Sequence, residues 1–320
     1  MREAASKLYV SQPALSASIW ELEKNRMRKK THLIFMLVAI VVCITSCGSD
    51  KIKSRNVEDY EQLEDIIRID EVENDESTEI LTYKIRYKSD ECEVIAYLSI
   101  PEKYLENEEA YPCIIYNRGG NREFGANKPE LIAYLAESLD NIVFATQYRG
   151  VSGGTGQDEF GGDDLHDVLK LLDLCEEFSF VDKDQLYMMG ASRGGMMTYM
   201  AIREDDRIKK AIVVSGEADN FMGWEEREDM HEVYMDLIGK TPEEAPEEYE
   251  KRSATYWADE IKCPVLIIHS ELDKRVSYAQ AEKMANCLEE AGKEYKFISY
   301  EDDMHGFHPE DYEIILDWIQ

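Results

Sequence analysis

The sequence is poor in basic residues. Its 320 residues include 36 Lys and Arg against 67 Asp and Glu, which gives a formal net charge of −31. Proteins bind nucleic-acid backbones through Lys and Arg that displace counterions, so this balance argues against a nucleic-acid partner. It also argues against docking on anionic lipid by charge alone. Any membrane link should therefore be a covalent lipid or an inserted segment.

The usual spacings of metal sites are also absent from the sequence. None of the seven cysteines forms a C-x-x-C pair and there is no H-E-x-x-H, so neither a structural zinc nor a zinc peptidase is indicated. Cys113 and Cys263 lie beside apolar runs typical of central strands, where we expect them to be buried as small apolar side chains. We expect no metal and no organic cofactor.

Residues 27–46 have the pattern of an export signal. Three basic residues at 28–30 precede an apolar run from Leu33 to Ile44, which is shorter than the ~20 residues that a membrane-spanning helix needs. The run ends in Ile-Thr-Ser-Cys at Cys47, which resembles the lipobox of bacterial lipoproteins. The resemblance implies cleavage before Cys47, a lipid on its thiol and a membrane-anchored location outside the cytoplasm. The alternative is a plain membrane anchor with an incidental cysteine.

Residues 2–24 carry a different pattern, the string A-A-x-x-L-x-x-S-Q-P-A-L-S. This string resembles about two helices of the helix-turn-helix of LysR-type transcriptional regulators, and it makes a DNA-binding regulator the alternative function. However, the positive and negative charges of this stretch nearly cancel, and a DNA reader cannot act upstream of an export signal. We interpret residues 1–26 as a fragment without function, left by an early start codon or a gene fusion, with translation starting at Met27.

Beyond the signal, the composition changes twice. Residues 47–78 are acidic and polar, and we expect lipid attachment and a tether there; residues 79–320 are expected to fold as one domain. Alternating apolar residues predict a hairpin over 80–87 and 91–100. Further strands are predicted at 113–116, 142–145, 186–189, 211–215, 265–269 and 295–299, and helices at 131–138, 165–175, 196–202, 279–291 and 312–319. Short apolar strands alternating with helices predict a mostly parallel sheet covered on both faces. The acidic, aromatic segment 217–261 predicts a small cap.

One strand-to-helix turn carries the motif of a nucleophilic serine. Gly190-Ala191-Ser192-Arg193-Gly194 is a G-x-S-x-G that follows an apolar strand and opens a helix, which is the context of a nucleophile elbow in an α/β-hydrolase fold. We predict that Ser192 is the nucleophile. The helix start favours developing negative charge, and the backbone N–H of Arg193 can donate to an oxyanion.

The residues that would activate this serine follow it in the order acid, then histidine. Asp273 comes just after the strand at 265–269, and His305 lies in a glycine-bearing loop after the next strand. This is the chain order of α/β-hydrolases, so we predict that His305 is the general base and Asp273 orients it. Glu271 is the alternative acid and His308 the alternative base.

Several strings along the domain, the elbow among them, support a family resemblance. They are Gln147–Gly150, Gly161–Val168, Gly190–Gly195, Arg252–Ala254, His269–Val276 and His305–Phe307. With them, residues 79–320 resemble the catalytic domain of the prolyl-oligopeptidase family of serine peptidases, which implies the same triad roles. It also implies that the loop after the first parallel strand supplies the second oxyanion donor. Arg118, Gly119 and the Tyr116 hydroxyl are the candidates.

The resemblance implies cleavage of a peptide or ester bond through an acyl-enzyme, with a peptide or small ester as substrate. Oligopeptidases of this family carry an N-terminal β-propeller, and we find no segment here that is long enough for one. This departure favours a carboxylesterase acting on small esters as the alternative. A hydrolase fold that only binds is disfavoured because the triad is intact.

Overall fold

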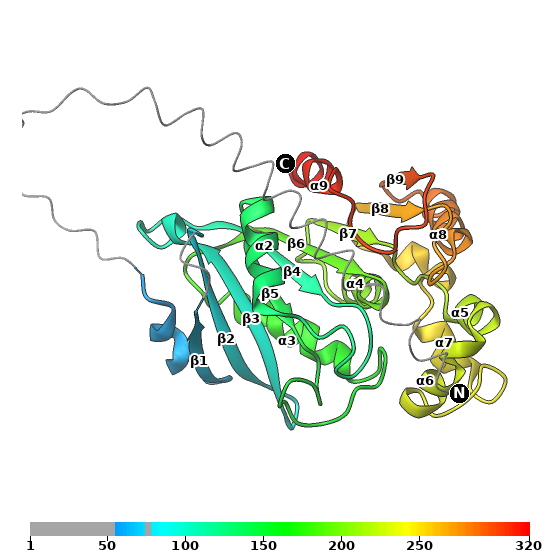
Figure 1. Cartoon of the computed structure of the whole chain (residues 1–320), viewed down its shortest axis with the longest axis horizontal. Coiled ribbons are helices and arrows are strands. Elements are labelled where there is room, and N and C mark those ends of the chain that lie inside the picture. The colour runs from blue at the N-terminus through cyan, green and yellow to red at the C-terminus, as the bar shows by residue number, and fades with distance from the viewer. Residues whose placement is uncertain (1–54, 74–77) are drawn as a thin grey trace, which may run out of the picture. The chain divides into compact units, whose positions relative to one another are not determined.

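A nine-stranded sheet organises the part of the chain that the computed structural model describes, residues 55–73 and 78–320 (Figure 1). The strand order is β1-β2-β3-β5-β4-β6-β7-β8-β9. The strands are β1 (Ile66–Val72), β2 (Ile80–Ser89), β3 (Cys92–Pro101), β4 (Tyr111–Asn117), β5 (Ile142–Thr146), β6 (Val181–Ala191), β7 (Lys210–Val214), β8 (Val265–Ser270) and β9 (Tyr295–Tyr300). Strands β1, β2, β3 and β5 pair antiparallel, whereas all pairings from β5 through β9 are parallel. The predicted hairpin and mostly parallel sheet are confirmed.

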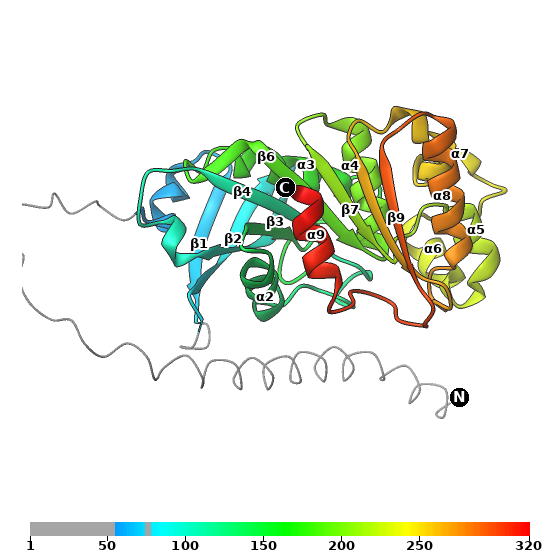
Figure 2. The ribbon, with the colours of Figure 1, turned by 90° about the horizontal axis from the view of Figure 1, so that it is seen from above.

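Helices cover both faces of the sheet (Figure 2). One face packs on α2 (Pro129–Leu139) and α9 (Asp311–Ile319). The other packs on α3 (Asp164–Cys175), α4 (Arg193–Glu204) and α8 (Tyr278–Glu290). Every residue of β5 and β8 is buried, because a parallel strand between two helical layers has no solvent face. All five helices predicted outside the cap are confirmed.

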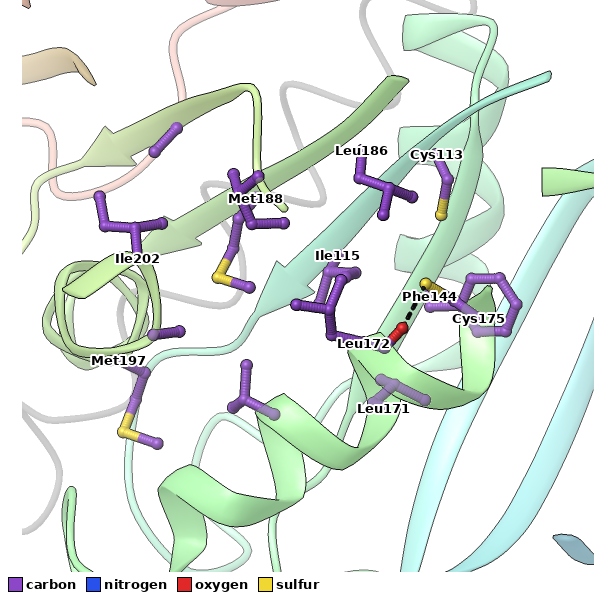
Figure 3. Packing of buried hydrophobic residues seen from close by; sticks show 14 of the residues in the cluster. Cys113, Ile115, Phe144, Leu171, Leu172, Cys175, Leu186, Met188, Met197 and Ile202 are labelled. Carbon is purple, nitrogen blue, oxygen red and sulfur yellow. Dashed lines mark hydrogen bonds between the residues drawn. The ribbon is translucent and has the colours of Figure 1, made fainter. Parts of the chain in front are cut away.

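The core between the sheet and α3 is made of aliphatic, aromatic and sulfur side chains (Figure 3). Cys113 of β4 is fully buried there, close to Cys175 of α3, whose thiol donates to the carbonyl of Leu172 at 3.1 Å. Cys263 is also buried, so the expectation for Cys113 and Cys263 is confirmed. Each fully buried Leu or Ile of this core contributes about 1.5–3 kcal/mol to the free energy of folding.

The tether predicted over residues 47–78 is wrong for the residues in it that the structure describes. A 3₁₀ helix (Val57–Gln62) leads into β1, which forms the edge of the sheet. Val57 is fully buried, and Ile66 and Ile69 face the core. These few apolar side chains are enough for an edge strand because β2 supplies its hydrogen bonds. Residues 1–54 and 74–77 lie outside the described residues, so the signal, Cys47 and the LysR-like string remain predictions.

The predicted cap is a helical segment between β7 and β8. Its helices are α5 (Asn220–Glu226), α6 (His231–Leu237) and α7 (Pro246–Lys251), and a short 3₁₀ turn joins α5 to α6. They gather near α8, at the end of the sheet where β9 lies (Figures 1 and 2). Within residues 55–73 and 78–320, no helix is long and apolar enough to cross a membrane.

Candidate active site

Ser192 lies at the turn between β6 and α4, as the G-x-S-x-G motif predicts. Its backbone has φ 58° and ψ −126°, a strained conformation for a residue with a side chain. Three backbone hydrogen bonds hold it: its N–H donates to Val214, and its carbonyl accepts from Gly195 and Glu217, at 2.8–3.1 Å. Two of these partners lie on β7 or just beyond its end. The serine is thus fixed by the neighbouring strand.

The glycines of the motif are needed because neighbouring backbone passes very close. A Cβ on Gly190 would lie 2.0 Å from the carbonyl oxygen of Gly194, and a Cβ on Gly194 would lie 2.0 Å from that of Asn117. Asn117 ends β4, so the turn is pressed against the adjacent strand. The elbow can form only where these positions have no side chain.

Asp273 and His305 meet, although 32 residues separate them in the chain. Nδ1 of His305 lies 2.8 Å from Oδ2 of Asp273, whose side chain is fully buried. The other oxygen of Asp273 accepts from the N–H groups of Arg275 and Val276. Burial opposes ionisation, but the hydrogen bond from His305 and those from the backbone lower the pKa of Asp273 below its usual value. Asp273 is thus suited to hold the imidazole of His305 through Nδ1, which leaves Nε2 for another partner.

The alternative residues make other contacts. Glu271 is exposed and accepts a hydrogen bond from the Ser299 hydroxyl at 3.2 Å, so it does not bind His305. His308 is buried and lies with Nε2 2.9 Å from a carboxylate oxygen of Asp302. The geometry therefore favours Asp273 over Glu271 and His305 over His308.

The loop that carries His305 is anchored beside the serine turn. The N–H of Gly306 donates to the hydroxyl of Ser215 at 3.1 Å. Ser215 directly follows Val214, to which the N–H of Ser192 donates. Serine turn and histidine loop therefore share one anchor, the end of β7. Parallel strands bring their carboxyl ends to one edge of a sheet, where α/β folds place their sites.

Gly119 is the oxyanion candidate that contacts the serine. A Cβ on Gly119 would lie 3.1 Å from the Cβ of Ser192 and 3.7 Å from its Oγ. Arg193 is the first residue of α4, and the N–H groups of a first helical turn have no partner within the helix. Gly119 and Arg193 therefore both lie next to Ser192, which leaves their backbone N–H groups as the candidate oxyanion donors.

The Arg118 side chain holds the loop that follows β4. Its guanidinium is buried and donates to the backbone carbonyls of Gly119, Arg122, Phe124 and Gln147, at 2.7–3.2 Å. These contacts engage the guanidinium within the protein. Burial and the neighbouring Arg193 lower the pKa of Arg118 to about 10. Tyr116 is buried on the face of the sheet that packs on α2 and α9, with the centroid of its ring 6.4 Å from that of Phe307.

Sequence reasoning missed the ion cluster beside the candidate oxyanion loop, which is the loop that follows β4 and carries Gly119. The Arg193 guanidinium is buried and pairs with Asp158 and Asp164, and it also donates to the carbonyl of Gly120. It lies between the rings of Tyr148 and Phe160, 4.8 Å from each centroid. One side chain thus joins the serine turn to the oxyanion loop. The strings around Tyr148 and Asp164 were available as a signal, but only as family resemblance.

Glu217 was also missed. It is 6% exposed, and its N–H donates to the carbonyl of Ser192. The sequence did contain a signal for Glu217, because it is a carboxylate just after a predicted parallel strand. No group of three or more His, Cys, Asp or Glu side chains able to hold a metal is found among residues 55–73 and 78–320.

Comparison with known proteins identifies the family of the chain. The sequence model of the prolyl oligopeptidase family matches residues 129–320. The chain is 31% identical over 236 residues to a Bacillus subtilis protein named uncharacterized peptidase YtmA, covering 73% of this chain and 90% of that protein. It spans about a third of two longer curated relatives.

Solved structures show the same fold. An acylaminoacyl peptidase from Pyrococcus horikoshii superposes with a TM-score of 0.64 at 22% identity, over 75% of this chain and 41% of that one. An acetyl xylan esterase from Paenibacillus sp. R4 superposes with a TM-score of 0.62 at 17% identity, over 79% and 87%. The predicted α/β-hydrolase fold is confirmed. By its sequence match and its fold, the chain belongs to the prolyl oligopeptidase family and is a serine hydrolase.

Proposed function

We propose that Ser192, His305 and Asp273 form the catalytic triad of this hydrolase. The observation that carries the proposal is the shared anchor at the end of β7: Val214 holds the serine turn, and Ser215 holds the loop whose His305 is bonded to Asp273. An oriented histidine near a strained, partly exposed serine is what nucleophilic catalysis requires.

In this mechanism the Ser192 hydroxyl attacks the carbonyl carbon of the substrate while His305 takes its proton. The resulting oxyanion accepts hydrogen bonds from the N–H groups of Arg193 and Gly119. His305 then returns the proton to the departing amine or alcohol, which leaves an ester on Ser192. Water attacks this ester in the same way and frees the enzyme. Asp273 holds the imidazole and stabilises its charged form.

We further propose that the physiological substrate is a peptide. The family match and the similarity to the protein named peptidase YtmA support this choice. Cleavage of a small ester is the second candidate, favoured by one observation: the chain spans 87% of the acetyl xylan esterase, against 41% of the acylaminoacyl peptidase. Both reactions use the same triad and differ in the acyl group transferred to Ser192 and in the leaving group.

A direct test compares the two substrate classes on one preparation. A fluorophosphonate probe should label the wild-type protein and not Ser192→Ala, since the probe reacts with an activated serine. Untreated enzyme from the same preparation is then assayed on short peptide amides and on acetylated sugars. Turnover of the amides at a kcat/KM above that of the acetyl esters supports the peptidase, and the reverse order supports the esterase. Absence of labelling contradicts the triad itself.

We propose in addition that the protein is a lipoprotein anchored through Cys47, at the membrane and outside the cytoplasm. The support is the apolar run from Leu33 to Ile44 followed by the lipobox-like Ile-Thr-Ser-Cys. A diacylglyceryl group brings two acyl chains, enough for stable anchoring. Cys47→Ala should release the protein from membranes or leave an uncleaved precursor. Mass spectrometry that finds residues 1–26 in the native protein, with Cys47 unmodified, contradicts the anchor and supports the regulator.

A further inference from the structure

One buried carboxylate next to the nucleophile has no charged partner in the part of the chain that the structure describes. Glu217 is 6% exposed, and its carboxylate takes part in no ion pair among the described residues. The Tyr234 hydroxyl donates to Oε1 at 2.6 Å, whereas no hydrogen bond to Oε2 is found in the described part of the chain. Two residues further on, Asp219 is also buried, but it pairs with Lys283. Burying a carboxylate without a partner is costly, so Glu217 needs a reason to be there.

The arginines around Glu217 are already engaged. Arg193 pairs with Asp158 and Asp164, and Arg227 pairs with Asp229. Both act on Glu217 only through the field of their charge. A cation that binds Glu217 directly must therefore come from outside the described residues.

Glu217 lies where the acyl half of a substrate has to go. Its backbone is bonded to Ser192, and Tyr234, its partner, packs edge-on against Phe160, which stacks under Arg193 at the start of α4. The leaving group must lie beside His305, because the imidazole protonates it. The acyl half then extends the other way, over the start of α4 and the end of β7.

The neighbouring cap also carries side chains that attract cations. A cavity of about 210 Å³ is lined by two aromatic rings, two carboxylates and a proline: Phe221, Trp224, Glu225, Pro242 and Glu243. Helix α5 forms part of its wall. The same helix packs against Glu217, because a Cβ on Gly223 would lie 2.7 Å from Oε1 of Glu217. Segment 217–261 contains 15 acidic residues and four basic ones. Aromatic faces and carboxylates both attract cations.

We propose that Glu217 binds a positively charged group on the acyl side of the substrate, so that the enzyme prefers a residue with an ammonium or guanidinium side chain at the scissile bond. This inference rests on the proposed function, because it assigns the specificity of that same site. The carboxylate would accept the cation at Oε2, with Tyr234 fixing Oε1. The pairing satisfies both the buried acid and the substrate charge.

The test uses two esters of equal shape on the whole protein, the p-nitrophenyl esters of Nα-acetyl-lysine and Nα-acetyl-norleucine. We expect a kcat/KM for the lysine ester at least ten-fold above that for the norleucine ester at pH 8. Glu217→Gln should lower this ratio by about ten- to a hundred-fold, the usual effect of losing a charged hydrogen-bond partner. Glu226→Gln, an exposed acid of the same helix region, is the matched control and should leave the ratio unchanged.

The pH dependence gives a readout that needs no variant. Burial raises the pKa of Glu217 to about 7, against the hydrogen bond from Tyr234 and the charges of Arg193 and Arg227, with Asp219 raising it further. The ionised form binds the cation, so the lysine-to-norleucine ratio should rise as the pH increases from 6 to 8. Both esters react at the same triad, so effects of pH that are common to the two reactions cancel in the ratio.

The outcomes separate this inference from the proposed function. Equal rates on the two esters, a ratio independent of pH, or an equal loss in Glu217→Gln and Glu226→Gln overturns the inference while leaving the triad intact. Failure to hydrolyse either ester, together with no fluorophosphonate labelling, overturns the proposed function itself. If Glu217→Gln does not fold, as judged by circular dichroism, the wild-type ratio and its pH profile still decide.

Discussion

The loops that carry Ser192 and His305 are built in opposite ways. The serine turn is surrounded by backbone: Gly190 and Gly194 have no room for a Cβ, and the Arg193 side chain beneath them is buried in an ion cluster. The histidine loop lies at the surface. Gly306 has open space around it, since a Cβ there would meet no other atom within 4 Å, and Met304 beside His305 is 36% exposed.

This difference shows where each loop gets its geometry. Backbone strain such as that at Ser192 persists only where surrounding contacts over-determine it. Ser192 is therefore positioned by packing, before any substrate binds. His305 depends instead on hydrogen bonds of its loop, chiefly its own to Asp273 and that of Gly306 to Ser215. Variants in the serine turn should therefore either keep or lose most of the activity. Variants in the histidine loop should lower the activity in graded steps.

The largest effect is expected from the nucleophile. Ser192→Ala should lower kcat on an activated ester by about 10⁶-fold, as measured when a triad serine is removed. Its fold should be unchanged, since the turn is held by backbone bonds that alanine keeps. Burst kinetics with a p-nitrophenyl ester measure the loss. A residual rate above a few per cent of the wild type would show that another group attacks the carbonyl.

Loss of the orienting acid should cost less. Asp273→Asn should lower kcat by about 10⁴-fold, because an amide offers His305 the wrong hydrogen-bond partner and tautomer. Glu271→Gln is the matched control, since Glu271 follows the same strand but its side chain bonds Ser299. It should retain most of the activity. If the two variants exchange their effects, Glu271 is the acid that acts in solution.

A pair of glycine variants compares the two loops directly. In Gly194→Ala the new Cβ would lie 2.0 Å from a backbone oxygen of β4, so the turn must move. A shift of ~1 Å at the nucleophile costs about 10²-fold in rate. Gly306→Ala has space but keeps φ at 125°, which favours glycine; its strain of about 1–3 kcal/mol should appear mainly in stability. Thermal melts and kcat of both variants test the contrast, and an equal loss of rate would contradict it.

The sequence predicted those features that depend on local pattern. The strand, turn and helix around Ser192 follow from apolar runs and glycine spacing within a few residues. Strand β1 was not predicted, because Ile66 and Ile69 have acidic residues around them in the sequence and the strand gains its hydrogen bonds from β2. Asp273 was predicted with Glu271 as the alternative acid, and the local pattern fits both, since both follow β8. The structure favours Asp273, whose carboxylate accepts from the N–H groups of residues 275 and 276 and is bonded to His305.

The ion cluster at Arg193 was beyond sequence reasoning for a similar reason. Arg193 meets Asp158 and Asp164 from 35 and 29 residues away, across two loops. Nothing in the spacing of these residues marks them as partners. Their pairing depends on how α3 and α4 pack on the sheet, which is a property of the whole fold rather than of any one segment.

The smallest effect is expected from the anchor of the histidine loop. Ser215→Ala removes the hydroxyl that accepts from the N–H of Gly306, a bond worth about 1 kcal/mol, so kcat should fall by about five- to ten-fold. KM should change little, because Ser215 is buried behind the loop. Ser299→Ala, whose exposed hydroxyl bonds Glu271, is the control and should have no effect. A loss as large as that of Asp273→Asn would mean that Ser215 determines the whole loop, and the histidine would then be as tightly preset as the serine.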